Sequence, residues 1–431
     1  MTNRFLKSRW FLMIPVFVCF SNTIKAQTAL TIEDCLQRAA DNYPLIQQYD
    51  LIERSREYST GNILKNYLPQ VSLNAQASLQ SDVTGLPLDM SSLPFDIDIP
   101  TLSKDQYRAT IDVSQQIWDG GITNTQRKLI EKNSEAEKQT VEVSLYAIRE
   151  KIIQLYFGIL AIDKHLTLLE LIEENLTSSK NIAQSMIKNG TAMQGDIDLI
   201  YVELLSVGKN KIEQESLRKA YLRMLGLFVN QSLSDDVLLQ IPITDYEPSR
   251  EINRPELNLF NAQNSIFDMQ RKLINAQNMP KIALFAQGGY GRPGLDLLDD
   301  GFRFFAIGGI KLTWNINRFY TQKNDLRLIE QKRQSTQIQK ETFLFNTNLT
   351  LTKEEEDIRK LKELIIKEDE IVQFRTRIKT VSESKYRNGV YQINELIRDV
   401  NAENQAMQSK SLHEIHYLMK IYNYNHLQGN K

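Results

Sequence analysis

Residues that could carry chemistry are few in this chain, and their spacing forms no known reactive site. The 431 residues include only four histidines, two of which, His413 and His416, are three positions apart. On a helix, residues at that spacing share one face and can bind a metal ion together. Because the sequence places no cysteine or acidic cluster beside them, we interpret them as surface histidines and predict no metal site.

Two further patterns have structural interpretations. Gly288-Gly289-Tyr290-Gly291 resembles a phosphate-binding glycine run, but it follows a strand pattern and opens a loop, whereas such runs open a helix. We therefore expect these glycines to ease the packing of strands. The run Glu354-Glu355-Glu356-Asp357 is interpreted as a solvated helix face. With no Walker A motif and no nucleophile elbow, the sequence predicts neither an enzyme nor a cofactor.

The first 26 residues are predicted to be a secretory signal peptide. A basic start precedes the apolar run Trp10–Phe20, and Ala26 precedes the expected cleavage site. Removing this segment takes away four positive charges and lowers the formal net charge from −1 to −5. Such a mild negative charge argues against nucleic acid as a partner.

After cleavage, Cys35 would be the only cysteine, so we expect no intrachain disulfide. No later segment contains 18 consecutive apolar residues, and we therefore expect no membrane-spanning helix. Strands of a membrane β-barrel would escape this test, because their residues alternate between apolar and polar.

The sequence contains an internal repeat. Asn42-Tyr43-Pro44 returns as Asn253-Arg254-Pro255 at a spacing of 211 residues, and Asn189-Gly190 returns as Asn388-Gly389 at a spacing of 199. One 12-residue difference between these sites, placed in a loop, explains both spacings. We predict two structural units, residues 27–230 and 253–431, joined by a linker at 231–252.

Each unit contains two segments that alternate between apolar and polar residues, at 71–79 and 107–117 and again at 282–290 and 302–314. Their lengths are close to the roughly 9–11 residues of a tilted membrane strand. Aromatic residues gather near the segment ends, and the polar positions are mostly uncharged. These features favour membrane strands, although strands of a soluble sheet would also alternate. Phe285, Phe305 and Ile307 interrupt the polar face of the second pair.

A very long helix is predicted after each strand pair. Residues 123–188 and 321–387 contain no proline. At ~1.5 Å per residue, such a helix would be about 100 Å long. The first has an apolar seam with alternating steps of four and three residues, the period of a coiled coil: Val141, Leu145, Ile148, Ile152, Leu155, Ile159, Ile162, Leu166 and Leu169. The glycines at 190 and 389 end the two helices, and 191–230 and 390–427 would return beside them.

Four strands cannot close a barrel in a membrane. Two open edges would leave backbone groups unpaired in lipid, at several kcal/mol each. Since about eight strands are the minimum for closure, at least two chains must share one barrel, and three chains would supply twelve strands. Long helices hanging from the strand ends would form a tube below, so passage is the predicted function.

The order of these elements resembles the TolC family of outer-membrane efflux proteins. The similarity covers essentially the whole mature chain, and it is carried by the repeated prolines, by Ile117-Trp118-Asp119-Gly120-Gly121 and by the two Asn-Gly turns. In the second unit Arg318-Phe319-Tyr320 replaces the Asp-Gly-Gly segment. The resemblance implies an α+β membrane protein: a homotrimer with a twelve-stranded barrel in outer-membrane lipid, continuous with an α-helical coiled-coil tunnel in the periplasm.

The same resemblance implies partners and a gate. The partners are a periplasmic adaptor (membrane fusion protein) and an inner-membrane pump of the RND or ABC type. The family's gate lies near the helix turns, with carboxylates six residues past the turn glycine. Applied to Gly190 and Gly389, the resemblance assigns the periplasmic constriction to the following set: Asp196, Glu395, Tyr386, Arg398 and Asp399. Arg398, with Asp399 beside it, stands where family members can carry a second carboxylate, so the sequence leaves open whether the gate has one or two charged rings. Arg398 could pair with Glu395 of its own or a neighbouring chain and hold the gate closed.

Two alternatives stay open at this point. The same duct could serve a type I protein secretion system, and sequence does not separate protein secretion from small-molecule efflux. A non-conducting coiled-coil scaffold of the periplasm is a third hypothesis of a different class.

Overall fold

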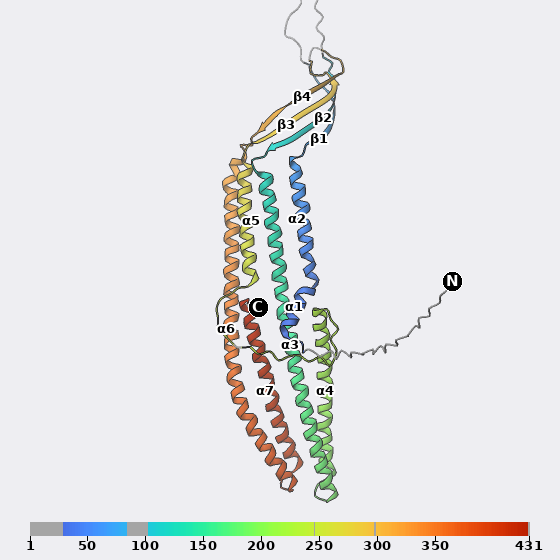
Figure 1. The fold of residues 1–431 in the computed structure, drawn as a ribbon, viewed down its shortest axis with the longest axis vertical. Coiled ribbons are helices and arrows are strands. Elements are labelled where there is room, and N and C mark those ends of the chain that lie inside the picture. The colour runs from blue at the N-terminus through green and yellow to red at the C-terminus, as the bar shows by residue number, and fades with distance from the viewer. Residues whose placement is uncertain (1–28, 84–101, 245, 297–298, 430–431) are drawn as a thin grey trace, which may run out of the picture.

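The computed structural model describes residues 29–83, 102–244, 246–296 and 299–429. The predicted signal peptide and most of the loop at 82–105 lie outside the described residues. The two halves contain the same order of elements after the short first helix (Figure 1). In chain order these are α1 (Ile32–Asn42), the 3-10 helix η1 (Pro44–Gln47), α2 (Gln48–Leu64), the 3-10 helix η2 (Lys65–Tyr67), β1 (Gln70–Leu79), β2 (Asp105–Trp118), α3 (Ile122–Lys188), α4 (Gln194–Val229), α5 (Pro255–Gln277), β3 (Lys281–Arg292), β4 (Arg303–Thr313), α6 (Arg318–Arg387) and α7 (Ile393–Gln428).

The four strands form one antiparallel sheet at one end of the molecule, in the order β1-β2-β3-β4. The central β2–β3 pairing joins the two halves, with Asp112 opposite Gln287. β1 and β4 are the edges, each paired on one side only within the described chain. The predicted strands are therefore confirmed, and the sheet has two open edges.

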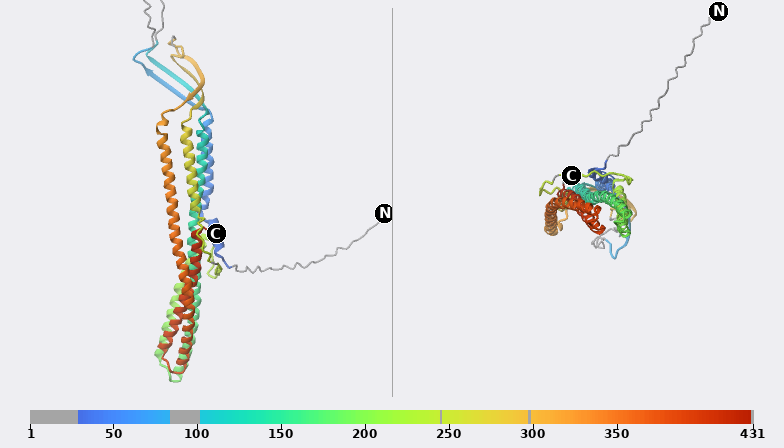
Figure 2. Two further views of the ribbon diagram at one scale, coloured as in Figure 1. Left: turned by 90° about the vertical axis from the view of Figure 1, so that its left-hand side faces the viewer. Right: turned by 90° about the horizontal axis from the view of Figure 1, so that it is seen from below.

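The helices form a long, curved wall below the sheet. α3 and α6 run most of its length, with α2 and α5 beside their upper halves and α4 and α7 beside their lower halves (Figure 1). Seen from below, the helices follow an open arc, and α1 and the linker lie on its convex side (Figure 2). The chain thus has the form of a trough rather than a closed bundle.

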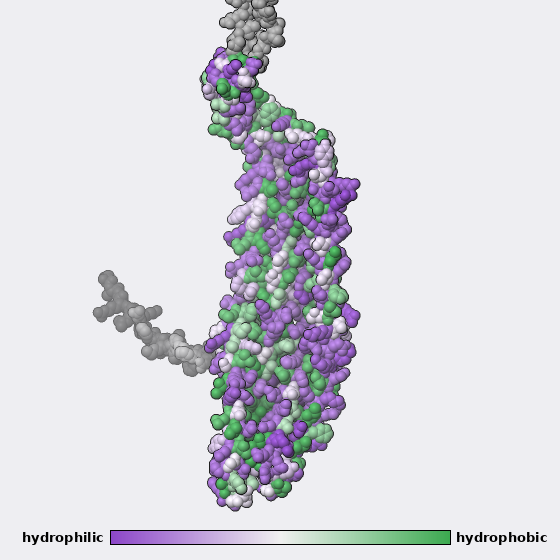
Figure 3. Space-filling view, turned by 180° about the vertical axis from the view of Figure 1, so that it is seen from behind, coloured by the Kyte–Doolittle hydropathy of each residue, from purple (hydrophilic) through white to green (hydrophobic). Residues whose placement is uncertain are grey.

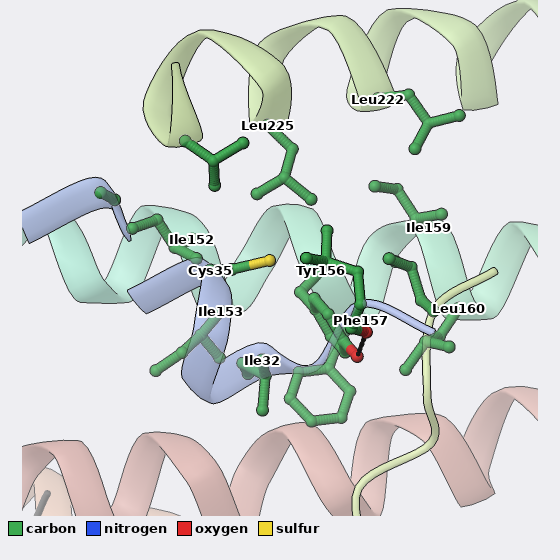
Figure 4. Close-up of a cluster of buried hydrophobic side chains, with 14 of the residues drawn as sticks. Ile32, Cys35, Ile152, Ile153, Tyr156, Phe157, Ile159, Leu160, Leu222 and Leu225 are labelled. Carbon is green, nitrogen blue, oxygen red and sulfur yellow. Dashed lines mark hydrogen bonds between the residues drawn. The ribbon is translucent and has the colours of Figure 1, made fainter. Parts of the chain in front are cut away.

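The predicted seam of α3 is the core of this wall. Ile152, Ile159 and Leu169 are buried, and the remaining seam positions are buried or partly buried. At mid-height α1 packs against α3 and α4, and its Ile32 and Cys35 have no exposed surface (Figure 4). The buried Tyr156 hydroxyl donates to the Leu30 carbonyl at 2.8 Å and to the Gln240 carbonyl at 2.7 Å, fixing the linker to the core.

Local signals set the ends of several helices. Thr31 caps α1 by accepting a hydrogen bond from the Asp34 amide at 3.1 Å. Asp119 caps α3 by accepting from the Gly121 amide at 2.9 Å and the Thr123 amide at 2.6 Å, and Tyr67 donates to it at 3.1 Å. α6, which starts at Arg318 in place of this aspartate, has no side-chain cap.

Glycine explains the interrupted polar face of the second strand pair. Phe305 lies over Gly289 of the neighbouring strand, where a Cβ atom would come within 2.6 Å of its ring. Phe285 lies over Gly309 in the same way, at 3.1 Å. The glycines thus make room for aromatic rings on the neighbouring strand. The run Gly288–Gly291 lies within β3 and does not open a loop as expected, and Gly289 eases strand packing whereas Gly288 has open space around it.

The interpretation of residues 354–357 as a solvated face is wrong for most of the run. Glu354 is buried and accepts from Lys420 of α7 at 2.9 Å. Asp357 pairs with the same lysine at 3.0 Å, and Glu355 accepts from Tyr424 of α7 at 3.0 Å. Only Glu356 is largely exposed. The acids join α6 to α7, a role that a count of charges along one helix could not reveal.

One described helix, α3, is long and apolar enough in one window to cross a membrane by composition alone. Because this window does not contain 18 consecutive apolar residues, it was not predicted from the sequence. Of the window, 56% is buried inside the protein, as in the core helix of a folded wall.

Candidate functional site

The two turns at the free end of the helices have the same backbone geometry. Gly190 and Gly389 both adopt φ 72°, a left-handed conformation that suits glycine. The Thr191 amide donates to the Met186 carbonyl at 2.9 Å, and the Val390 amide donates to the Lys385 carbonyl at 2.9 Å. Each of these hydrogen bonds runs from the amide after the glycine back to a carbonyl in the last turn, and so ends the long helix. The chain therefore presents two matched hairpins, α3–α4 and α6–α7.

The two predicted gate carboxylates also have matched positions. Asp196 accepts a hydrogen bond from the Met193 amide at 2.9 Å, and Glu395 accepts one from the Gln392 amide at 3.0 Å. Both are thus third residues of the returning helices, in capping boxes that satisfy backbone donors. Each side chain is half-buried. Within one chain, the two carboxylates therefore act as helix caps.

Tyr386 lies between the hairpins. Its side chain is 2% exposed, and it packs in a core cluster with Ile197 of α4 and Ile393 of α7. Burial raises the pKa of Tyr386, and the nearby Asp196 carboxylate raises it further. Its hydroxyl is buried without a hydrogen-bond partner among the described residues. An unsatisfied buried donor costs ~1–3 kcal/mol.

Asp399 is buried, and its links stay within the second hairpin. Its carboxylate accepts from the Ser382 hydroxyl of α6 at 2.5 Å. The exposed Arg398 lies against it at 3.3 Å. The ion pair made by Arg398 in one chain is therefore with Asp399 and not with Glu395. Pairing with Glu395 of a neighbouring chain stays a prediction.

A buried ion pair lies further from the same turn, and it was not predicted from the sequence. Lys379 of α6 contacts Glu403 of α7 at 3.0 Å, and Glu403 is 1% exposed. The sequence does show that Lys379 and Ser382 lie three positions apart and therefore share one face of a helix. Without the hairpin register, however, nothing in the sequence pointed to their partners.

The first hairpin is apolar at four of the five equivalent positions, and the fifth is Lys180. At the repeat spacing of 199 residues, the second-hairpin residues Lys379, Ser382, Tyr386, Asp399 and Glu403 correspond to Lys180, Ala183, Ile187, Ile200 and Leu204. Ala183 and Ile200 are fully buried. Lys180 lies over the ring of Tyr201, 5.5 Å from its centroid, rather than beside an acid. The polar links therefore belong to the second hairpin alone.

His413 and His416 have separate surroundings. His413 lies 2.8 Å from Glu368 of α6, while burial lowers the pKa of His416. Among the described residues, no group of three or more potential ligands is placed to hold a metal ion.

The arrangement of sheet and hairpins is shared with solved bacterial outer-membrane channels. The outer-membrane channel OprN matches with a TM-score of 0.67 at 12% identity, over 93% of this chain and 90% of that one. The outer membrane protein VceC from Vibrio cholerae matches with a TM-score of 0.66 at 13% identity, over 93% and 96%. The Neisseria gonorrhoeae outer membrane channel MtrE, solved in its open state, gives 0.65 at 12% identity, over 93% and 89%. No protein-family model matches the chain, and no curated protein matches its sequence.

Proposed function

We propose that this chain, whose fold is that of the TolC family of outer-membrane channels, is one third of an outer-membrane export duct. In this proposal three chains close a twelve-stranded barrel, and their helices form a tunnel in the periplasm. The duct is a passive conduit for small molecules in a tripartite efflux system, served by a periplasmic adaptor and an inner-membrane pump. The division into units 27–230 and 253–431 with a linker at 231–252 belongs to the same proposal.

One observation carries the proposal: within the described part of the chain, both lateral edges of the trough and both edges of the sheet are unpaired. On one side, α2 exposes Leu51 and Tyr58, seven residues apart. On the other, α6 exposes Ile338 and Phe345, also seven apart. A heptad spacing is what two packed helices require. Different edges meeting head to tail generate a closed ring when the rotation fits, and in the same ring β4 would pair with β1 of the next chain.

The lower halves of the edges carry similar apolar stripes. α4 exposes Val202, Leu205 and Ile212, and α6 exposes Phe374 and Val381. Figure 3 shows hydrophobic residues along the helices on the face seen from behind, among hydrophilic ones. Burying these stripes against a neighbour would stabilise an assembly by roughly 25 cal/mol per Å² of apolar surface.

The internal repeat predicts which residues meet between chains. Within one chain, Arg254 at the start of α5 lies 5.2 Å from the ring of Tyr146 on α3. The repeat spacings carry this contact to residue 43 of one chain and Phe345 of its neighbour. α2 and α6 run in opposite directions. Moving about two helical turns along each, from residue 43 and from Phe345, therefore places Leu51 close to Ile338. Both side chains are more than 60% exposed in one chain.

Cysteine cross-linking tests this trimer. In the full-length protein, Leu51→Cys with Ile338→Cys should form interchain disulfides and give a ladder ending at the trimer under oxidation. Cys35 is fully buried and should stay unmodified. The matched control is Leu51→Cys with Phe374→Cys, because Phe374 lies about 54 Å further along α6. A purely monomeric protein, or equal cross-linking of the control, would refute the assembly.

The helix turns supply the proposed gate. Three copies of Glu395 and of Asp196 near one axis would repel one another and attract cations. Tyr386, Arg398, Asp399 and the turn glycines Gly190 and Gly389 complete the candidate constriction. Type I protein secretion remains the second candidate function, because the same trough would serve it. A deletion strain tested against dyes, antibiotics and metals, and for exported protein, separates the two.

A further inference from the structure

A basic groove lies between α5 and α6, below the sheet. It encloses about 310 Å³ and is lined by Arg271, Lys323, Leu326, Arg327, Ile329, Glu330 and Arg333. Arg333 is paired with Asp268 at 3.1 Å. Among the described residues, Arg271, Lys323 and Arg327 have no carboxylate at ion-pair distance. The groove therefore presents three free cations against one carboxylate.

The internal repeat shows that most of the groove cations are specific to the second copy, whereas Arg327 has the cationic counterpart Lys128. At the repeat spacings, three of the four groove cations and the first residue of α6 have neutral or acidic counterparts in the first copy. Arg271, Lys323, Arg333 and Arg318 correspond to Thr60, Asn124, Ser134 and Asp119. Because the fold of the two copies is the same there, the packing of helices does not require these cations. They suit a ligand instead.

The height of the groove along the molecule points to a membrane surface. α6 starts at Arg318, five residues after β4 ends at Thr313. At ~1.5 Å per residue, Lys323 lies about 8 Å and Arg327 about 14 Å from that start. The headgroup layer extends roughly 5–7 Å beyond the hydrocarbon on each side. Lys323 therefore lies close to the edge of such a layer and Arg327 beyond it. Because side chains lean toward the N-terminus of their helix, both long side chains lean back toward the layer.

Exposed aromatic residues lie between the sheet and the groove. Trp314, Phe319 and Tyr320 all have exposed side chains. Tryptophan and tyrosine are typical of the boundary between hydrocarbon and headgroups. The first copy carries Gly120 and Gly121 at the positions of Phe319 and Tyr320 and exposes Trp118 at the end of β2, so the second copy is the richer in aromatic residues here.

Ideal helix geometry predicts that the groove opens on the convex side of the trough. Leu326 and Glu330 lie 36 residues, about ten helical turns, from Lys362 and Ile366 on the same face of α6. Those two residues line a cavity together with Ile241 of the linker. The linker runs on the convex side (Figure 2), so the groove faces away from the enclosed space of the proposed tube.

We infer that this groove binds the phosphate of an anionic phospholipid in the periplasmic leaflet, an inference that rests on the proposed outer-membrane duct. Arginine guanidinium groups hold phosphate oxygens in bidentate hydrogen bonds, and lysine adds a point charge. The aromatic residues hold the adjoining glycerol and acyl region. A trimer would carry three such sites, fixing the height and rotation of the duct in the membrane.

Native mass spectrometry of the detergent-purified, full-length protein tests the inference. Binding of phosphatidylglycerol is compared with that of zwitterionic phosphatidylethanolamine. The variant Arg271→Thr with Lys323→Asn installs the first-copy residues. With ~1 kcal/mol for each cation near an anionic lipid, its affinity for phosphatidylglycerol should fall about 30-fold. Lys128→Gln with Lys132→Gln removes two positive charges from the first turns of α3, outside the groove, and should change affinity less than about threefold.

A gain-of-function variant and a soluble competitor complete the test. Thr60→Arg with Asn124→Lys should add a second lipid per chain. Equal losses in the groove variant and the α3 control would overturn the inference, as would equal binding of the two lipids. Displacement of phosphatidylglycerol by about 10 mM inorganic phosphate would identify a free-anion site and overturn the lipid assignment. Channel conductance is measured separately on the same proteins and should not change between the variants. If the unmodified protein shows no conductance, that result counts against the duct and not against the groove.

Discussion

The two helical hairpins of this chain share their turns and differ in what joins their helices. Near its turn the first hairpin is held by apolar contacts, with Ala183 and Ile200 fully buried, and its ion pair of Arg218 with Asp163 lies further from the tip. At the same positions the second hairpin has the hydrogen-bonded pair Ser382 and Asp399. One turn further from the tip it adds the buried ion pair of Lys379 with Glu403.

This difference bears on which hairpin moves. Separating an apolar seam costs roughly 25 cal/mol per Å² of newly exposed apolar surface, and that surface forms no hydrogen bonds with water. A hydrogen bond that is exchanged for water has a net value of only ~1 kcal/mol. We therefore propose that the second hairpin opens while the first remains a fixed wall. The unpartnered Tyr386 hydroxyl lies between the two.

The largest expected effect comes from Lys379→Met. Removing this cation leaves Glu403 buried without its ion-pair partner, which should lower the free energy of local opening by ~3–5 kcal/mol. Hydrogen exchange of peptides from the ends of α6 and α7 measures that free energy. The matched control is Lys180→Met on α3, where only a cation–π contact worth under ~1 kcal/mol is lost. Equal loss of protection in both variants would contradict the difference between the hairpins.

A smaller effect is expected from Ser382→Ala, which removes the hydroxyl donor to a buried carboxylate and should cost ~1–3 kcal/mol. Adding Asp399→Ile reproduces the apolar pair of the first hairpin and should recover most of that loss. A double-mutant cycle by hydrogen exchange measures the coupling. Additive losses would show that the two side chains act independently.

Acid should weaken the second hairpin more than the first. Hydrogen bonds from Lys360 and then Lys420 lower the pKa of Asp357 to about 2. A depressed pKa means that this contribution is fully present above the ordinary value of 3.8 and is lost as the pH falls through about 2. Protection of α6 and α7 should therefore fall between about pH 4 and pH 2, and Asp357→Asn should reduce that dependence. A steeper fall in α3 and α4 would reverse the comparison.

The smallest effects on stability are expected from Glu395→Gln and Asp196→Asn. An amide oxygen can still accept the capping hydrogen bond, so each change should cost under ~1 kcal/mol. Their effect should appear in transport, as altered cation block of the trimer. If the conductance and cation dependence of Glu395→Gln match those of the unmodified protein, Glu395 does not line the constriction.

The sequence predicted the elements of this fold because each has a local signature. Alternating residues predicted β1 to β4, and the proline-free stretch at 123–188 predicted α3 to within one residue of its start. The tertiary links could not be predicted this way. The run at 354–357 looks solvated until α7 brings Lys420 beside it, and Phe305 interrupts a polar pattern until Gly289 lies beneath it. Both depend on the register between elements, which one sequence does not contain.

Single-channel recording in a planar lipid bilayer tests whether the assembled protein is a duct. The purified full-length trimer should insert and give discrete, uniform conductance steps. Lys379→Met should raise the fraction of time spent in the larger steps, while Lys180→Met should not. A cross-linkable trimer that inserts and passes no current would contradict the duct and favour a non-conducting scaffold.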